Sequence, residues 1–342
     1  MLPFLRAAGM KTRILFASPQ PSETPDLTGV AARAVEAACD VVVLQKVRGP
    51  QAVSLALQLA AQGIRTVFVV CDVVDVEMVK VTDATIVVTE YLRSLYPKEL
   101  QHRIHVVHDG IERPLVHKTH WRQQPGRKLS AVLVTSVQLS QLPVLQRPPA
   151  WLDVRIVGRY ASGMRKWHEL RWTLASKTSR QRLSYLRFLL DRRIECVPWS
   201  LEGVYAEMLA ADIGIIPVET PAPRADSPLP AWTVKSENRL TMKMSLGLPV
   251  IAVPIRSYEN VVEHGVNGFF ASSLRDWSAC LNALRDPDRR ADMGQAARAS
   301  VSPRYSMHQQ SIKLIKALQA AQAGRARAFD AAPTWAPGVA AD

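Results

Sequence analysis

A polar and basic stretch stands directly before a buried apolar run in the second half of the chain. The stretch "KSENRLTMKMSLGLPVIAVP" places Lys235, Asn238 and Arg239 ahead of that run. We predict a helix over 235–246 that Ser236 caps at its amino end. A helix amino terminus attracts anions, and flanking cations add charge-assisted hydrogen bonds. The stretch therefore indicates a phosphate-binding site, and its alternative interpretation is a capped surface helix with ordinary charges.

The charge of the chain is strongly positive and unevenly distributed. Its 342 residues carry a formal net charge of +13 and a pI of about 9.9. Between Arg155 and Arg193 stand eleven lysines and arginines against two acids. This balance favours anionic partners, and the segment has the pattern of an amphipathic basic helix. It is either a solvated helix face or a surface that binds an anionic membrane or an acceptor.

Several function classes do not fit the sequence. No apolar run approaches the roughly 18 residues of a membrane-spanning helix. We find no helix-turn-helix, zinc-ligand spacing or aromatic RNA-binding platform, so we expect no nucleic-acid partner. The four cysteines lie in or beside apolar runs, which indicates a reduced, cytoplasmic protein with thiols in its core.

Apolar strand-like runs alternate with helix-like runs throughout, which predicts parallel sheets covered on both faces. We expect an α/β protein with two Rossmann-like doubly wound domains in tandem and a cleft between them. The predicted organisation is a first domain over 10–112, a linker over 113–128, a second domain over 129–323 and a disordered tail over 324–342. The predicted strands are 13–17, 40–45, 65–71, 84–89 and 104–108 in the first domain, and 131–135, 154–157, 194–197, 213–218, 249–253 and 268–270 in the second.

Ligands of such sheets bind at the carboxyl ends of the strands, so the polar residues that follow each strand are candidates. In the first domain these include Gln45, Lys46, Asp72 and Glu90. In the second domain they include Arg159, Trp199 and Glu219, and then the segment from Pro254 to Tyr258.

The region around the basic stretch resembles a known family. "KSENR", followed by "MSLGLPVIAVPIRSYENVVEHGVNGFF" and preceded by "VYAEMLAADIGIIPVE", is similar to the donor domain of B-fold glycosyltransferases. The resemblance is to the large retaining group that uses nucleotide-sugars, group 1 or family 4. "DVVVLQK", "DATIVVTEYL" and "VVHDGIE" look like the acceptor-domain strands and the hinge. The match covers 195–320 most closely, extends to 40–112 and is weak over 112–195.

The resemblance implies roles for these candidates. Lys235 and Arg239 would contact the donor diphosphate and stabilise the leaving group without a metal or other cofactor. Apart from the resemblance, Asp72 is a candidate acceptor base because it follows a strand of the first domain. The acceptor, a saccharide or a lipid-linked saccharide, would meet Gln45, Lys46 and Glu90. The remaining donor-binding candidates are Arg159, Ser236, Asn238, Glu219, Ser257 and Tyr258.

Two departures from the family pattern leave an alternative open. Val234 and Met242 stand where many relatives carry carboxylates, and Glu219 would have to supply one from a neighbouring strand end. The resemblance as a whole leads us to expect a glycosyltransferase of surface polysaccharide assembly at the cytoplasmic face of a membrane. The alternative is a non-catalytic relative that binds a polyanion or partner through residues 155–193.

Overall fold

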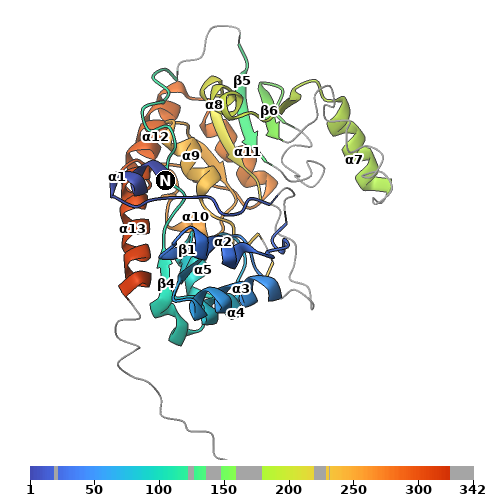
Figure 1. Cartoon of the computed structure of the whole chain (residues 1–342). Coiled ribbons are helices and arrows are strands. Elements are labelled where there is room, and N and C mark those ends of the chain that lie inside the picture. Colours follow the sequence, from blue (N-terminus) through green and yellow to red (C-terminus); the bar gives the residue numbers. More distant parts are fainter. Residues whose placement is uncertain are drawn as a thin grey trace, which may run out of the picture. The chain divides into compact units, whose positions relative to one another are not determined.

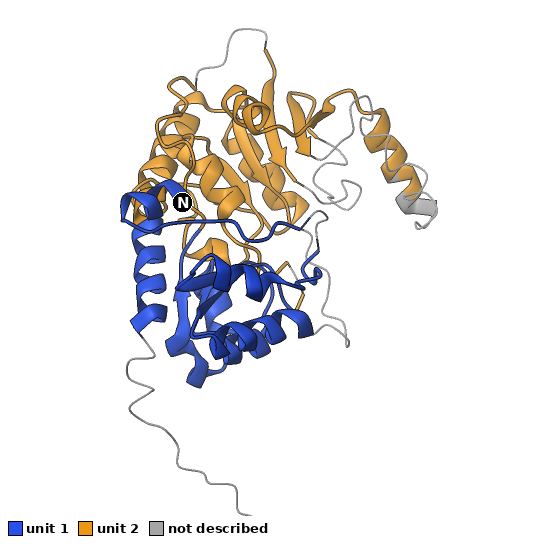
Figure 2. Cartoon of the chain, in the orientation of Figure 1, with its two compact units in different colours: residues 1–108, 310–342 blue, residues 109–309 orange. Residues whose placement is uncertain are grey.

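A computed structural model describes residues 1–18, 22–121, 127–135, 148–158, 179–218, 229–230 and 232–323. The chain forms two compact units (Figures 1 and 2). Unit 1 comprises residues 1–108 and 310–342, and unit 2 comprises residues 109–309. The predicted tail over 324–342 lies outside the described residues, as do Arg159 and Glu219.

Unit 1 contains a four-stranded parallel sheet with the order β1-β2-β3-β4. Its strands are rich in β-branched residues, which suit a pleated surface. The strands are β1 (Val41–Gln45), β2 (Arg65–Val70), β3 (Ala84–Val87) and β4 (Ile104–Val106). Helix α2 (Val30–Glu36) precedes β1, and the elements between the strands are α3 (Pro50–Ala61), α4 (Val76–Val81), α5 (Glu90–Ser94) and the 3₁₀ helix η1 (Lys98–Arg103).

The strand predicted over 13–17 does not form. Residues 11–18 have no regular secondary structure, and Ile14 is 74% exposed. An apolar run forms a buried strand only if one of its faces reaches a core, and this one does not. The strand prediction at this position was therefore wrong, and among the described residues the sheet of unit 1 begins with β1.

The chain's first and last helices belong to the core of unit 1. Leu5 of α1 (Leu2–Ala7) and Leu318 of α13 (Met307–Ala323) lie in one buried cluster with Val67 and Ile86 of the sheet. The His108 backbone N–H also donates to Gln310 Oε1 at 2.9 Å. Unit 1 thus contains two segments that the sequence interpretation treated otherwise: residues 1–9, left outside the first domain, and residues 310–323, most of α13, which were assigned to the second.

Unit 2 contains a six-stranded parallel sheet with the order β10-β9-β8-β5-β6-β7. The strand order reverses at β5, which lies between β6 and β8, and this is the topological switch point where ligand sites form in such sheets. The strands are β5 (Leu129–Val134), β6 (Leu152–Gly158), β7 (Ile194–Pro198), β8 (Ile213–Ile216), β9 (Val250–Ala252) and β10 (Phe269–Phe270).

Helices cover both faces of this sheet, as the alternation along β5 shows. Leu129, Ala131 and Leu133 lie in the cluster with α7 and α11, whereas Val132 lies in the cluster with α8. Successive side chains of a strand point to opposite faces, so both faces are buried. The helices are α7 (Ser179–Leu190), α8 (Leu201–Ala210), α9 (Asn238–Ser245), α10 (Arg256–Glu259), α11 (Leu274–Ala283) and α12 (Pro287–Val301).

The carboxyl end of α9 is held against α12 by two glycines. A Cβ on Gly294 would lie 2.2 Å from the carbonyl oxygen of Gly247, so no larger residue fits there. The indole N–H of Trp121 donates to that same carbonyl at 2.8 Å. The fully buried Arg290 donates to the Trp121 carbonyl at 3.1 Å. Residues 113–121, predicted as the start of a linker, therefore pack on unit 2 as far as Trp121.

Candidate functional site

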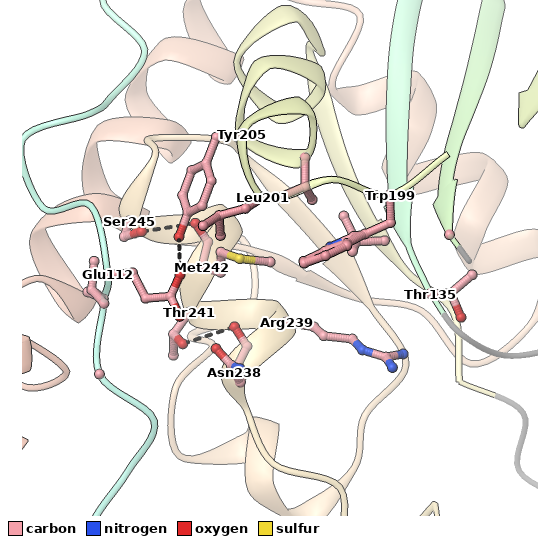
Figure 3. Close-up of a pocket in the computed structure, with 15 residues that line it drawn as sticks. Glu112, Thr135, Trp199, Leu201, Tyr205, Asn238, Arg239, Thr241, Met242 and Ser245 are labelled. Atoms are coloured by element: carbon pink, nitrogen blue, oxygen red, sulfur yellow. Dashed lines mark hydrogen bonds between the residues drawn. The ribbon is translucent and has the colours of Figure 1, made fainter. Parts of the chain in front are cut away.

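Unit 2 has a pocket of about 440 Å³ at the carboxyl ends of β5 and β6, lined by α8 and α9 (Figure 3). This volume lies within the range of small-molecule sites. The lining residues are Gly110, Ile111, Glu112, Val134, Thr135, Gly158, Trp199, Leu201, Val204, Tyr205, Asn238, Arg239, Thr241, Met242 and Ser245.

The helix that carries the cationic residue begins three positions later than predicted. α9 starts at Asn238, its N-cap is Glu237, and no side chain caps it, so the prediction that Ser236 caps it was wrong. The carbonyl of Lys235 instead accepts a hydrogen bond from Ser257 Oγ at 2.6 Å. That contact ties the preceding turn to α10 and keeps Lys235 out of the helical ladder.

Asn238 and Arg239 are the first two residues of α9, and both line the pocket (Figure 3). The first N–H groups of a helix have no acceptor within the helix and carry partial positive charge. The backbone N–H groups of Leu240 and Thr241 both donate to the Glu237 carbonyl at 2.9 Å. Arg239 thus extends its guanidinium into the pocket from the first turn of a helix whose amino end carries partial positive charge.

An exposed aromatic side chain lies opposite this helix start. Trp199 follows β7 and is 51% exposed, although it lines the pocket (Figure 3). Its backbone N–H donates to the Gly158 carbonyl at 2.7 Å, which fixes the end of β7 against the end of β6. A large ring that stays half in solvent offers a flat face on which an aromatic ligand can stack.

A third wall combines an acidic and a phenolic group, and a cationic side chain outside the lining packs on the phenol ring. Tyr205 Oη donates to Glu112 Oε2 at 3.3 Å, and burial, followed by the charge of Glu112, raises the Tyr205 pKa to about 12. The guanidinium carbon of Arg113 lies 4.6 Å from the Tyr205 ring centroid. Arg113 also binds Glu202 through two hydrogen bonds of 2.5 and 2.9 Å. The phenol therefore stays protonated near neutral pH and acts as a hydrogen-bonding group.

The other donor-binding candidates lie outside the pocket lining. Lys235 and Ser236 are partly buried in the turn before α9. Ser257 is 5% exposed, and its hydroxyl donates a hydrogen bond to the Lys235 carbonyl. Tyr258 is 1% exposed, and burial raises its pKa far above its ordinary value. Among the donor-binding candidates that the structure describes, Asn238 and Arg239 are therefore the two that line the pocket.

The candidates of unit 1 lie at the carboxyl edge of its sheet. Gln45 ends β1 and is exposed, and Lys46 follows it with a positive φ of 55°. Asp72 is exposed two positions after β2. Glu90 is the first residue of α5, where its carboxylate lies 3.8 Å from Arg93. Because parallel strands end at one edge, these residues share that edge of unit 1.

Some lining residues were missed by sequence reasoning. Trp199 was marked by its place after a strand, but it received no role. Glu112, Thr135 and Tyr205 carried no comparable signal, because their participation depends on how the segment after β4, the end of β5 and α8 meet. Met242 did carry a signal, since it replaces an expected carboxylate, and it lines the pocket.

The fold was compared with solved structures. A HepE complex from Anabaena with UDP and glucose has a TM-score of 0.62 at 16% identity, covering 86% of this chain and 82% of that chain. A glycosyltransferase from Rickettsia africae has a TM-score of 0.62 at 12% identity, covering 94% and 87%. Sucrose-phosphate synthase from Thermosynechococcus elongatus has a TM-score of 0.59 at 14% identity, covering 92% and 82%.

The chain has the GT-B fold, with two Rossmann-like units. Residues 66–116 also match the model of the glycosyl transferase family 4 group. The B-type fold expected from the motifs is thus confirmed by the solved structures, and the family model matches the chain within the first-domain motifs rather than the donor motifs. No curated protein matches the chain by sequence. No helix among the described residues of this GT-B chain is long and apolar enough to span a bilayer.

Proposed function

We propose that this protein is a glycosyltransferase that moves a sugar from a nucleotide-sugar to a saccharide or lipid-linked acceptor. The observation that carries the proposal is the pocket of unit 2, in which Arg239 stands at the amino end of α9, with Trp199 also in the lining. The family match supports the reaction class, and the UDP-bound HepE structure supports a nucleotide as ligand.

The chemistry follows from where charge develops. When the bond between the sugar and the diphosphate breaks, negative charge accumulates on the departing phosphate. A guanidinium has a rigid fork of donors that matches phosphate oxygens, and the helix end adds its N–H groups. Groups placed in advance around that charge stabilise the transition state more than the ground state. We therefore propose that Arg239 binds the phosphates of the leaving group and that the Trp199 ring stacks on the nucleobase.

The acceptor side of the proposal lies in unit 1. The new bond forms between the sugar carbon and an acceptor hydroxyl, whose proton passes to a base. Asp72 is our proposed base, and Gln45, Lys46 and Glu90 are our proposed acceptor contacts, because all four lie at the carboxyl edge of the parallel sheet. Retention of configuration and independence from metal are part of the proposal through the family resemblance.

The test is binding of nucleotides by the full chain. A thermal-shift panel of UDP, GDP, ADP, CMP and TDP, each with and without its sugar, should show stabilisation by one diphosphate. Arg239→Ala should weaken that binding by roughly 10- to 100-fold, the value of a charge-assisted pair. Arg275→Ala is the matched control, because Arg275 is exposed on α11 and lies outside the pocket lining. Failure of every nucleotide to bind would refute the donor site.

We also propose that α7 holds the protein on an anionic membrane surface. Leu183, Leu186 and Leu190 are 52%, 37% and 68% exposed, and their spacing places them on one helix face. The exposed Arg182 and Arg187 stand among them, while other apolar residues of α7 are buried in the core of unit 2. Exposed leucines flanked by arginines suit the boundary between anionic headgroups and acyl chains.

Co-sedimentation with liposomes of phosphatidylcholine and phosphatidylglycerol at low salt tests this surface. The wild type should sediment with the vesicles, and the triple change Leu183→Ser, Leu186→Ser and Leu190→Ser should leave it in solution. Leu274→Ser removes a leucine that is 64% exposed at the start of α11 and serves as the control. Equal sedimentation of the triple variant and the wild type would refute the role of α7.

A further inference from the structure

Helix α9 carries a lysine that is completely buried. Lys243 has no exposed surface, and its Nζ donates to the carbonyl oxygen of Arg239 at 3.2 Å. This carbonyl is the one hydrogen-bond partner that the described residues provide for the amine. Arg239 precedes Lys243 by one helical turn, so the side chain runs back towards the amino end of α9. The amine thus lies beneath the turn that lines the pocket.

The strand below α9 makes room for this side chain. A Cβ on Gly214 in β8 would lie 2.8 Å from Lys243 Cδ, closer than such atoms approach. A glycine inside a strand weakens the strand and often marks a place where another group approaches closely. Here that group is the stem of Lys243. The burial of Lys243 thus depends on a glycine in a different element, since a side chain at position 214 would occupy the space of the lysine stem.

The charged groups around the amine leave it close to losing its proton. On its own segment these are Arg239 and the N-cap Glu237; β8 and β9 contribute no ionisable side chain. The buried ionisable side chain of α12 is Arg290, which donates to the carbonyls of Leu284, Arg285 and Trp121. Burial, and then repulsion by Arg239, lower the Lys243 pKa from 10.5 to about 7.

We propose that Lys243 is a second, buried cation for the donor's phosphates, which takes up a proton when a diphosphate binds beside Arg239. The inference rests on the proposed donor site and adds a residue to it. In the protein without ligand, the positive charge of Arg239 disfavours the protonated form of the Lys243 amine. A bound diphosphate outweighs the charge of Arg239 and favours the protonated amine. The proton comes from solvent, and no covalent step is involved.

The expected proton uptake follows from simple electrostatics. A net negative charge about 8 Å away raises the pKa of such an amine by roughly one to two units at an effective dielectric constant of about 20. At pH 8 an amine that titrates near 7 holds about 0.1 proton, and after that shift it holds about 0.5 to 0.9. Binding should therefore take up about 0.4 to 0.8 proton at pH 8.

Calorimetry measures this uptake directly. UDP, and in turn GDP, ADP and TDP, are titrated into the full chain at pH 8 in two buffers with different enthalpies of ionisation. The difference in binding enthalpy divided by the difference in ionisation enthalpy gives the protons taken up. At this pH the nucleotide's phosphates are fully ionised and contribute none. The wild type should also bind more weakly as the pH rises from 7.5 to 9.

Two variants separate Lys243 from other lysines. Lys243→Met should still bind the nucleotide, with proton uptake close to zero. Lys118→Met is the matched control, because Lys118 is also partly buried and donates to the carbonyls of Leu209 and Ala211. Lys118 does not line the pocket, so this variant should keep the wild-type uptake.

The outcomes distinguish this inference from the proposed function. Uptake that Lys243→Met abolishes and Lys118→Met retains would support the inference. Binding by the wild type without proton uptake would overturn it and leave the donor site standing. Absence of binding by all four nucleotides would overturn both. The outcome that overturns the inference is measured on the wild type, so it does not depend on whether either variant folds.

Discussion

The buried amine of Lys243 should make the stability of the empty protein depend on pH in a specific direction. In the unfolded chain the lysine keeps its ordinary pKa of 10.5, and in the folded chain burial lowers it to about 7. Between these values the unfolded state binds one more proton, so the free energy of unfolding rises as the pH rises. Below pH 7 both states are protonated, and the full cost of burying the ammonium group remains.

The magnitude follows from the size of the shift. A difference of about 3.5 units corresponds to roughly 5 kcal/mol across the whole range, at about 1.36 kcal/mol per unit. Between pH 7.5 and 9.5 the contribution changes by roughly 2–3 kcal/mol. Lys243→Met fills a similar volume with an unbranched apolar chain and lacks this dependence. Its stability advantage over the wild type should therefore shrink by roughly 2–3 kcal/mol from pH 7.5 to 9.5.

Urea unfolding followed by tryptophan fluorescence tests this expectation. Seven of the eight tryptophans lie between Trp121 and Trp277, so the signal reports on unit 2. Lys128→Met is the control, because the Lys128 side chain is 51% exposed and its ammonium group stays hydrated. If the stability of Lys243→Met and that of the wild type change in parallel over this range, the amine is not titrating as the burial requires. The reasoning would then be refuted.

Three further changes test the packing and the pocket. Gly214→Ala should destabilise unit 2 by about 1–3 kcal/mol, since its Cβ would press on Lys243 Cδ, and denaturation of the double variant with Lys243→Ala should show a smaller loss. Arg290→Met should lower the unfolding free energy by roughly 2–4 kcal/mol, because three carbonyls lose their donor. Trp199→Ala should weaken nucleotide binding by roughly 5- to 100-fold while leaving the melting temperature unchanged, because the ring is 51% exposed.

Most of the fold could be predicted from the periodicity of the sequence. The β-branched runs at Val41–Gln45 and Arg65–Val70 are typical of buried parallel strands, and both form strands. The run at 13–17 has the same local pattern, yet it is not a strand, because burial depends on whether a neighbouring strand is available. The crossover at 108–109 lies within the predicted hinge, whereas the return of the chain to unit 1 at 309–310 was not predictable. It depends on the packing of α13 on Leu5 and Val67, and such contacts have no local signature.

The site could be predicted in part, for a related reason. Arg239 and Asn238 were found because their types and spacing at a helix start suffice to indicate an anion site. The start of α9 itself was misplaced, because the Ser257 hydroxyl binds the Lys235 carbonyl and ends the turn outside the helix. Ser257 lies 22 positions away, so no inspection of the stretch alone could reveal that bond. Lys243 was overlooked because its burial depends on Gly214 in another element.

The two positions that lack the family's carboxylates have different consequences in the structure. Val234 is 2% exposed, so a carboxylate there would be buried, whereas Met242 lines the pocket, where a carboxylate would face the ligand. The acidic group in the described lining is Glu112, which already accepts a hydrogen bond from Tyr205. The pocket therefore keeps the cationic group suited to phosphates and, at Met242, lacks one carboxylate that could accept a hydrogen bond from a sugar hydroxyl. This combination favours a ligand that is held chiefly by its negative charge, and in such a site a proton taken up by Lys243 would matter more than in a relative with both carboxylates.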